Sequence, residues 1–246
     1  MEFWHIRFKH VSSIHGNPWH LIWRHRSEEA FIPETYDSDY LESLEFGFKS
    51  TLADGKLILN GAYFMMDWND FQSTTYNLDY STVAFVDNVG NAEINGLELD
   101  ATYRPNDSLT LSAYMVSNDP SLSQDYFDVS GVLQANAGNR LAYVPELSYV
   151  LGMDKVLTIA GKPGYFALDY SYTGDRYTSQ ANTLKLPSYA IANMRMGVEM
   201  ENSLMEIYLT NLTDENGYQS RYDDFGDVRR TQNRPRVVGV RFKYRY

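Results

Sequence analysis

The end of the chain alternates strictly between apolar and polar side chains, and this pattern restricts the fold more than any other feature of the sequence. On an extended chain one face carries Val238, Val240, Phe242, Tyr244 and Tyr246, and the other carries Gly239, Arg241, Lys243 and Arg245. A strand of a soluble sandwich also alternates, but lipid outside and water inside a β-barrel produce the same pattern. A strand that runs to the last residue favours the membrane barrel.

The same period of two continues through most of the chain from about residue 40. Leu97 and Leu99, for example, alternate with Glu98 and Asp100. In the run 56–72 both faces are apolar, so the pattern leaves its outward face open. We expect an all-β fold with no helix and about nine strands, near residues 40–52, 56–72, 93–104, 108–115, 148–158, 165–175, 189–200, 204–211 and 237–246.

The connections between these strands alternate in length. They are short at 53–55, 105–107, 159–164 and 201–203, and long at 73–82, 119–145, 176–186 and 212–233. Outer-membrane barrels have short periplasmic turns and long external loops. If the C-terminus lies in the periplasm, the first of nine antiparallel strands must enter the membrane from the external side. Complete bacterial barrels have an even number of strands, so nine strands predict a transmembrane segment of a larger barrel. An ordered strand before residue 36 would overturn this parity argument.

Composition excludes several classes of protein. The chain has no cysteine, so disulfides and thiolate chemistry are excluded. Its formal net charge of -11 argues against a nucleic-acid partner, because phosphates require a basic surface. No stretch approaches the roughly 18 apolar residues of a transmembrane helix.

The first 25 residues differ from the rest of the chain. All five histidines lie there, at His5, His10, His15, His20 and His25. A spacing of five places successive histidines on opposite faces of a strand, so they form no local metal-ligand set. The segment also lacks the pattern of a secretory signal. We expect residues 1–32 to be an atypical N-terminal segment outside the domain and residues 33–246 to form the barrel portion.

No motif for catalysis, nucleotide binding or metal binding is present, and no histidine follows His25. We therefore expect no enzyme, no catalytic or metal site and no cofactor. The polar faces of the strands are expected to form a hydrated wall of paired charges around the lumen, made of Glu45, Lys49, Glu98, Asp100, Asp169, Arg195, Glu199, Glu206, Arg241, Lys243 and Arg245.

The long connections carry carboxylates and aromatic residues. The carboxylates lack the spacing of a calcium loop. The aromatic residues Tyr126, Phe127, Tyr143, Tyr177, Tyr218, Tyr222 and Phe225 are compatible with a site for a planar or sugar-like ligand, and equally with an aromatic girdle at the membrane surface. The sequence leaves both readings open, and the ligand-binding residues stay unknown.

Four parts of the chain together resemble barrel signatures of one family, the TonB-dependent receptors of Gram-negative outer membranes. Residues 33–35 (PET) and 44–50 (LEFGFKS) resemble its P-E-x … E-x-G-x-K strand, and residues 59–64 (LNGAYF) with 67–72 (DWNDFQ) resemble the strand that follows. Residues 86–92 (VDNVGNA) with 95–99 (NGLEL) resemble its N-x-G-x-A … x-G-x-E signature. Residues 211–214 (NLTD) with 234–239 (RPRVVG) resemble its closing N-L-T-D … R-P-R-x-x-G. Thr213 and Asp214 belong to this motif, for which the family assigns no catalytic task.

The resemblance implies the C-terminal part of a plugged barrel of about 22 strands in the outer membrane. It implies uptake of a ferric siderophore or similar scarce nutrient, energised by the TonB complex only if a plug is supplied. Expected partners are outer-membrane lipid and the barrel-assembly machinery, which would read the strand that ends at Tyr246. The chain lacks the plug and first strands of the family pattern, so we do not expect it to transport alone. The alternatives are a passive porin-like or adhesin-type barrel and a soluble carbohydrate-binding β-domain.

Overall fold

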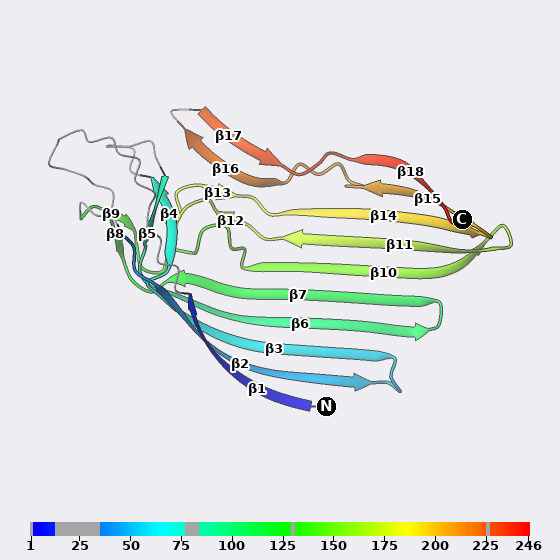
Figure 1. Cartoon of the computed structure of the whole chain (residues 1–246), viewed down its shortest axis with the longest axis horizontal. Coiled ribbons are helices and arrows are strands. Elements are labelled where there is room, and N and C mark those ends of the chain that lie inside the picture. Colours follow the sequence, from blue (N-terminus) through cyan, green and yellow to red (C-terminus); the bar gives the residue numbers. More distant parts are fainter. Residues whose placement is uncertain (1, 13–34, 77–83, 129–130, 225–226) are drawn as a thin grey trace.

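The computed structural model describes residues 2–12, 35–76, 84–128, 131–224 and 227–246. Within them the chain forms strands and turns but no helix, and its centre is one antiparallel sheet of ten strands (Figure 1). Their order across the sheet is β1 (Glu2–Ser12), β2 (Asp39–Leu52), β3 (Leu57–Asn69), β6 (Ala92–Asn106), β7 (Leu109–Leu122), β10 (Leu147–Ile159), β11 (Lys162–Thr173), β14 (Tyr189–Met200), β15 (Ser203–Thr210) and β18 (Val237–Tyr244).

The nine predicted strands are all present, and β1 joins them as a further strand. It pairs antiparallel with β2 from Glu2 opposite Lys49 to Ser12 opposite Asp39. The parity argument was therefore wrong, because a strand precedes β2 and runs in the opposite direction. The pairing joins the backbone of β1 to the backbone groups at the edge of β2.

Register determines which side chains share a face, because Cα partners in neighbouring strands point to the same side. One row runs through Lys49, Asn60, Asp100, Tyr114 and Val150. Together with the pairs further along the sheet, it places the predicted lumenal residues of the strands on one face, called here the polar face. Arg245 was also predicted to face the lumen, but it follows the end of β18, so strand register does not assign it to a face.

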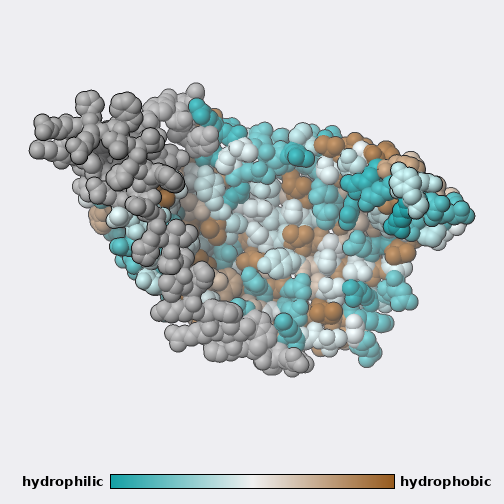
Figure 2. Space-filling view, in the orientation of Figure 1, coloured by the Kyte–Doolittle hydropathy of each residue, from teal (hydrophilic) through white to brown (hydrophobic). Residues whose placement is uncertain are grey.

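The opposite face, called here the apolar face, carries the alternating hydrophobic residues. On β18 it contains Val238, Val240 and Phe242, whose relative exposures are 65%, 63% and 64%. Register also resolves the open run 56–72: Leu57, Leu59, Tyr63 and Met65 lie on the apolar face and Asn60 lies on the polar face. The side of the molecule seen in Figure 2 shows hydrophobic residues as separate spots among polar ones rather than as one continuous patch.

The predicted sorting of the connections by length is confirmed for the described residues. Short turns join the strands at the end where both termini lie, and long connections lie at the opposite end (Figure 1). Each of four long connections contains a two-stranded hairpin. These hairpins are β4–β5 (Gln72–Tyr76, Ala84–Asn88), β8–β9 (Tyr126–Phe127, Leu133–Ala135), β12–β13 (Arg176–Tyr177, Lys185–Leu186) and β16–β17 (Tyr218–Asp224, Asp227–Gln232).

A compact hydrophobic cluster lies where β6 and β7 meet the first two hairpins. Its buried members are Phe71, Val89, Ala92, Leu122, Tyr126, Ala135 and Leu141. Trp68 packs against it, with its ring 5.2 Å from that of Phe71, and its indole N–H donates a hydrogen bond of 2.9 Å to Asp39. This cluster attaches the β4–β5 and β8–β9 hairpins to the sheet.

Glycines on the polar face make room for aromatic rings from the neighbouring strand. A Cβ at Gly197 would lie 2.5 Å from the ring of Tyr165, which crosses β14 at that point. Tyr208 covers Gly239 in the same way. The rings fill space on the sheet surface that the missing side chains leave open.

The hydrophobic cluster predicts that two equivalent changes on β7 have unequal effects. Leu122 is 1% exposed. The substitution Leu122→Ala should lower the unfolding free energy of the protein by about 2–5 kcal/mol, because a cavity remains in the cluster. Leu111 lies on the apolar face at 37% exposure, so Leu111→Ala should lose clearly less. Urea unfolding in detergent micelles measures both, and equal losses would show that the cluster does not stabilise the fold.

Candidate functional site

The end of the sheet that carries the hairpins holds the densest polar networks in the described part of the chain. No group of three or more His, Cys, Asp or Glu in that part is arranged to hold a metal ion. None of the described residues forms a helix long and apolar enough to cross a membrane. The candidate site is therefore built from side-chain contacts between the long connections and from the polar face below them.

Asn88 secures the root of the connection between β3 and β6. Its Nδ2 donates to the carbonyls of Asp37 and Asp70, at 3.0 and 2.6 Å, and its Oδ1 accepts from Asp37 N at 2.7 Å. The Oδ1 of Asn91 accepts from Asp70 N at 3.0 Å, where Asp70 has a positive φ of 53°. The sequence VDNVGNA therefore connects its own backbone to the backbone at Asp37 and at Asp70. An asparagine side chain can do this because its amide group both donates and accepts hydrogen bonds.

The NLTD and RPR segments form a second root of this kind, between β15 and β18. Asn211 accepts from Glu215 N at 2.8 Å and donates to the carbonyls of Glu215 and Arg234, at 2.9 and 3.0 Å. The carboxylate of Asp214 accepts from Arg236 N at 2.8 Å. Asp214 and its motif thus have a structural role, which is to close the base of the connection that carries β16–β17.

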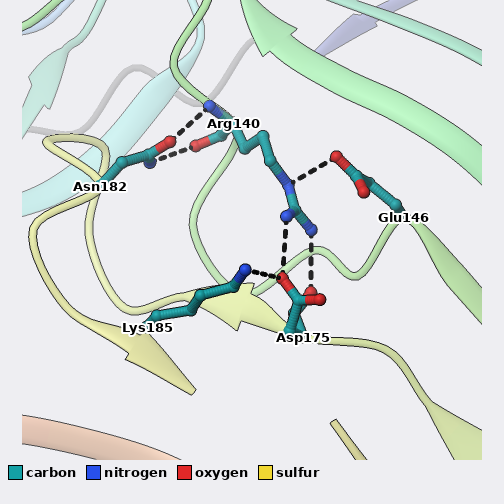
Figure 3. Close-up of polar contacts among 5 residues, drawn as sticks. All are labelled: Arg140, Glu146, Asp175, Asn182 and Lys185. Carbon is teal, nitrogen blue, oxygen red and sulfur yellow. Dashed lines mark hydrogen bonds and ion pairs between the residues drawn. The ribbon is translucent and has the colours of Figure 1, made fainter. Parts of the chain in front are cut away.

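Arg140 ties the second long connection to the third. Its Nε lies 3.1 Å from Glu146 Oε1, its Nη1 lies 3.0 Å from Asp175 Oδ2, and its Nη2 donates to the Asp175 carbonyl at 2.8 Å (Figure 3). Lys185 Nζ reaches the same Asp175 oxygen at 2.8 Å. Asn182 bonds the backbone of Arg140 in both directions, each at 2.8 Å. We call these five residues the Arg140 cluster.

The charges of the Arg140 cluster stabilise the ionised forms of Asp175 and Lys185. The Lys185 ammonium and the Arg140 guanidinium hold the pKa of Asp175 below its ordinary value of 3.8, against partial burial, which acts in the opposite direction. Asp175 raises the pKa of Lys185. Because the carboxyl pKa is lowered on folding, its contribution to stability is present above pH 3.8 and is lost only as the pH falls through the lower folded value.

Further contacts connect the remaining hairpins in sequence around the rim. Tyr126 Oη donates to Asp87 Oδ2 at 3.0 Å, which joins the first two connections. Tyr143 N donates to the Tyr177 carbonyl at 2.7 Å, beside the Arg140 cluster. Arg176 Nη2 donates to the Tyr218 carbonyl at 2.9 Å, which joins the third connection to the fourth.

On the polar face below, two of the predicted lumenal residues, Glu206 and Arg241, form an ion pair across strands. Arg241 Nη1 lies 2.7 Å from Glu206 Oε1, and the Tyr165 hydroxyl donates to the other oxygen of Glu206. Asn193 donates to Asp169 at 2.6 Å. Glu206 is buried, and its partners lie on the neighbouring strand β18 and, two strands away on the other side, on β11. Among the described residues predicted to line the lumen, Glu206 pairs with Arg241, and Asp100 and Asp169 accept hydrogen bonds from asparagines.

The aromatic residues predicted for ligand binding occupy different environments. Tyr126 is buried in the hydrophobic cluster, and Tyr177 lies beneath Arg140 and Lys185 at 5.5 and 5.8 Å. Phe127 and Tyr143 are exposed at 52% and 43%. The side chain of Tyr222 and the whole of Phe225 lie outside the described residues, as do His15, His20 and His25.

The comparisons with known proteins agree with this architecture. A family model described as "TonB dependent receptor-like, beta-barrel" matches residues 36–213. The chain belongs to the TonB-dependent receptor family. This places it in the outer membrane of a Gram-negative bacterium, as an antiparallel part of an all-β barrel.

Solved structures of this family have the same fold. The ferric yersiniabactin uptake receptor FyuA from Yersinia pestis is 20% identical, with a TM-score of 0.70 over 85% of this chain and 30% of that chain. The siderophore receptor PiuA from Acinetobacter baumannii is 20% identical, with a TM-score of 0.67 over 85% and 29%. The ferric-catecholate import receptor Fiu from K12 E. coli is 16% identical, with a TM-score of 0.67 over 98% and 32%. The chain thus spans less than a third of the length of each.

Sequence reasoning missed the contacts that connect the external hairpins. Arg140 and Asp175 lie 35 positions apart, and no spacing rule relates two residues in different loops. A signal was present only in the asparagine-rich motifs, because Asn88 and Asn211 belong to family signatures that lie at loop roots.

The Arg140 cluster predicts a selective effect of one substitution. Arg140→Gln should lower the unfolding free energy by about 1.5–3 kcal/mol and speed proteolysis between residues 174 and 188, because Asp175 loses a charged partner. The matched control is Arg236→Gln, whose exposed pair with Asp214 is 4.0 Å long and should contribute less than about 1 kcal/mol. Urea unfolding and limited proteolysis measure both, and similar behaviour of the two variants would contradict the assignment.

Proposed function

We propose that this chain contributes barrel wall and external loops to an outer-membrane receptor for a ferric siderophore or a similar scarce nutrient. The observation that carries the proposal is the family match over residues 36–213, which spans most of the sheet and three of its hairpins. FyuA, PiuA and Fiu are named as uptake, siderophore or import receptors, and we extend that class of activity to this chain. In this role the chain binds and passes a solute and is not an enzyme.

We also propose that the chain does not transport alone. In the described sheet, β1 and β18 each pair with a neighbour on one side only. Unpaired backbone groups in hydrocarbon cost several kcal/mol each, so an open sheet edge is unfavourable in lipid. Residues 33–246 are our proposal for the barrel portion that follows the family pattern, since the family match begins at residue 36; β1 precedes it and extends the sheet by pairing with β2. Additional strands would close the barrel, and a plug would connect it to the TonB complex.

The proposed partners follow from the two faces and the end of the sheet. The apolar face fits outer-membrane lipid because its large side chains are exposed on the main-sheet strands from β2 to β18. The aromatic end of the chain, where the Tyr244 and Tyr246 rings lie 5.6 Å apart, is the proposed signal for the barrel-assembly machinery. The polar face would surround the transport path.

The function is tested by uptake of radioactive iron in iron-starved cells. Deleting the genomic region that encodes the chain should remove uptake of one siderophore class, and deleting the TonB complex should have the same effect. Expressing residues 1–246 alone should not restore uptake, because the sheet stays open. Unchanged uptake after deletion would contradict the receptor proposal, and uptake that persists without the TonB complex would favour a passive porin-like barrel.

A further inference from the structure

Arg176 is a buried cation that has no anionic partner among the described residues. It belongs to β12 and is 6% exposed. Its Nη2 donates to the carbonyls of Tyr218 and Gln219, at 2.9 and 3.2 Å, and its Cζ lies 5.5 Å from the centre of the Tyr189 ring. Its Nη1 is buried and has no hydrogen-bond partner. Within the described residues no carboxylate forms an ion pair with it.

This arrangement differs from that of Arg140 and of Glu206. Arg140 has both Asp175 and Glu146, and Glu206 has Arg241. A buried guanidinium is unfavourable unless it is paired and fully hydrogen-bonded. In Arg176, the carbonyls of Tyr218 and Gln219 accept from Nη2 only, and Nη1 has no acceptor. A carboxylate or phosphate would engage the planar guanidinium through two parallel, charge-assisted bonds, which are stronger.

The surroundings of Arg176 also favour an anion. The β16–β17 hairpin places Arg221 directly opposite Arg230, and like charges in this position repel each other. Arg230 lies 5.3 Å over the ring of Tyr218, whose carbonyl accepts from Arg176. Arg176 and Arg230 therefore both contact Tyr218, one at its carbonyl and the other over its ring.

The enclosure of Arg176 is provided by the hairpin itself. The carbonyls that accept from the guanidinium belong to the start of β16. The same strand accepts a 3.5 Å bond from the Tyr143 hydroxyl at the Arg221 carbonyl. An anion can therefore reach Arg176 only when the hairpin lifts, which couples anion binding to hairpin release.

We propose that Arg176 anchors an oxyanion site between β12 and the β16–β17 hairpin. A carboxylate or phosphate group replaces the carbonyls of Tyr218 and Gln219, and the hairpin is released from the rim. If the anion belongs to a transported ligand, this site rests on the proposed receptor function. The site itself is a property of this chain and can be measured without transport.

The test is trypsin cleavage of the full chain in detergent micelles. Arg229 and Arg230 are exposed on β17, and an isolated two-stranded hairpin is marginally stable, so release should speed cleavage there. Inorganic phosphate or citrate should accelerate this cleavage about tenfold, which corresponds to one charge-assisted bond gained. Sodium chloride at the same ionic strength should not. Arg176→Gln should be cleaved rapidly from the start and should not respond to phosphate.

Two controls separate the site from general effects. Arg236→Gln removes an exposed arginine of the same connection and should keep the full phosphate response. Arg176→Lys keeps the charge without the fork and should keep a reduced response, with the cleavage pattern elsewhere showing that the variants are folded.

A further arm identifies the source of the anion. Phospholipid vesicles with and without lipopolysaccharide, at low phosphate, distinguish a membrane phosphate from a soluble ligand. Release by soluble phosphate or citrate alone assigns a soluble ligand, and release by lipopolysaccharide assigns a lipid. A wild-type chain that responds equally to chloride, or does not respond to any anion, overturns the proposal. Neither result affects the uptake experiment, so failure of this site and failure of the receptor function remain distinguishable.

Discussion

Hydrogen bonding between neighbouring backbones is the constraint on which the rest of the structure depends. In hydrocarbon every N–H and C=O needs a partner within the protein, and the ten-stranded antiparallel ladder supplies one for its interior strands. The ladder also imposes the period of two, so each strand sends alternate side chains to lipid and to water. Beyond the ladder, in the long connections, Asn88, Arg140 and Asn211 satisfy backbone groups through side chains instead.

Most of the sheet could be predicted from the sequence because its two faces meet different solvents. Alternation located every strand from β2 to β18 in the main sheet, and loop lengths located its two ends. β1 was missed for a physical reason: an edge strand pairs through backbone groups, and Trp4, His5 and Arg7 do not form a clean two-faced pattern. The faces of β3 were ambiguous for the opposite reason, since Phe64 and Trp68 are apolar yet share the polar face. Phe64 is buried there over Gly96, and Trp68 packs against the hydrophobic cluster.

The candidate site was far less predictable than the sheet. Its contacts join residues from different connections, such as Arg140 with Asp175 and Arg176 with Tyr218, and no local period encodes such pairs. The family motifs mark the positions where loops are rooted, whereas the contacts between loops depend on where each hairpin lies. The rim therefore combines the Arg140 cluster, whose guanidinium is paired with carboxylates, with the start of the β16–β17 hairpin, whose carbonyls cover Arg176. Within the described residues Arg176 is buried and forms no ion pair.

The central claim is that one face of each strand meets lipid and the other meets water. The chain has no native cysteine, so single cysteines can be placed along β14 and spin-labelled in lipid vesicles. Accessibility to oxygen, which partitions into lipid, should be high at 192, 194, 196 and 198 and low at 193, 195, 197 and 199. Accessibility to a water-soluble nickel chelate should follow the opposite pattern. Equal values along the strand, or alternation of the reverse phase, would contradict the account.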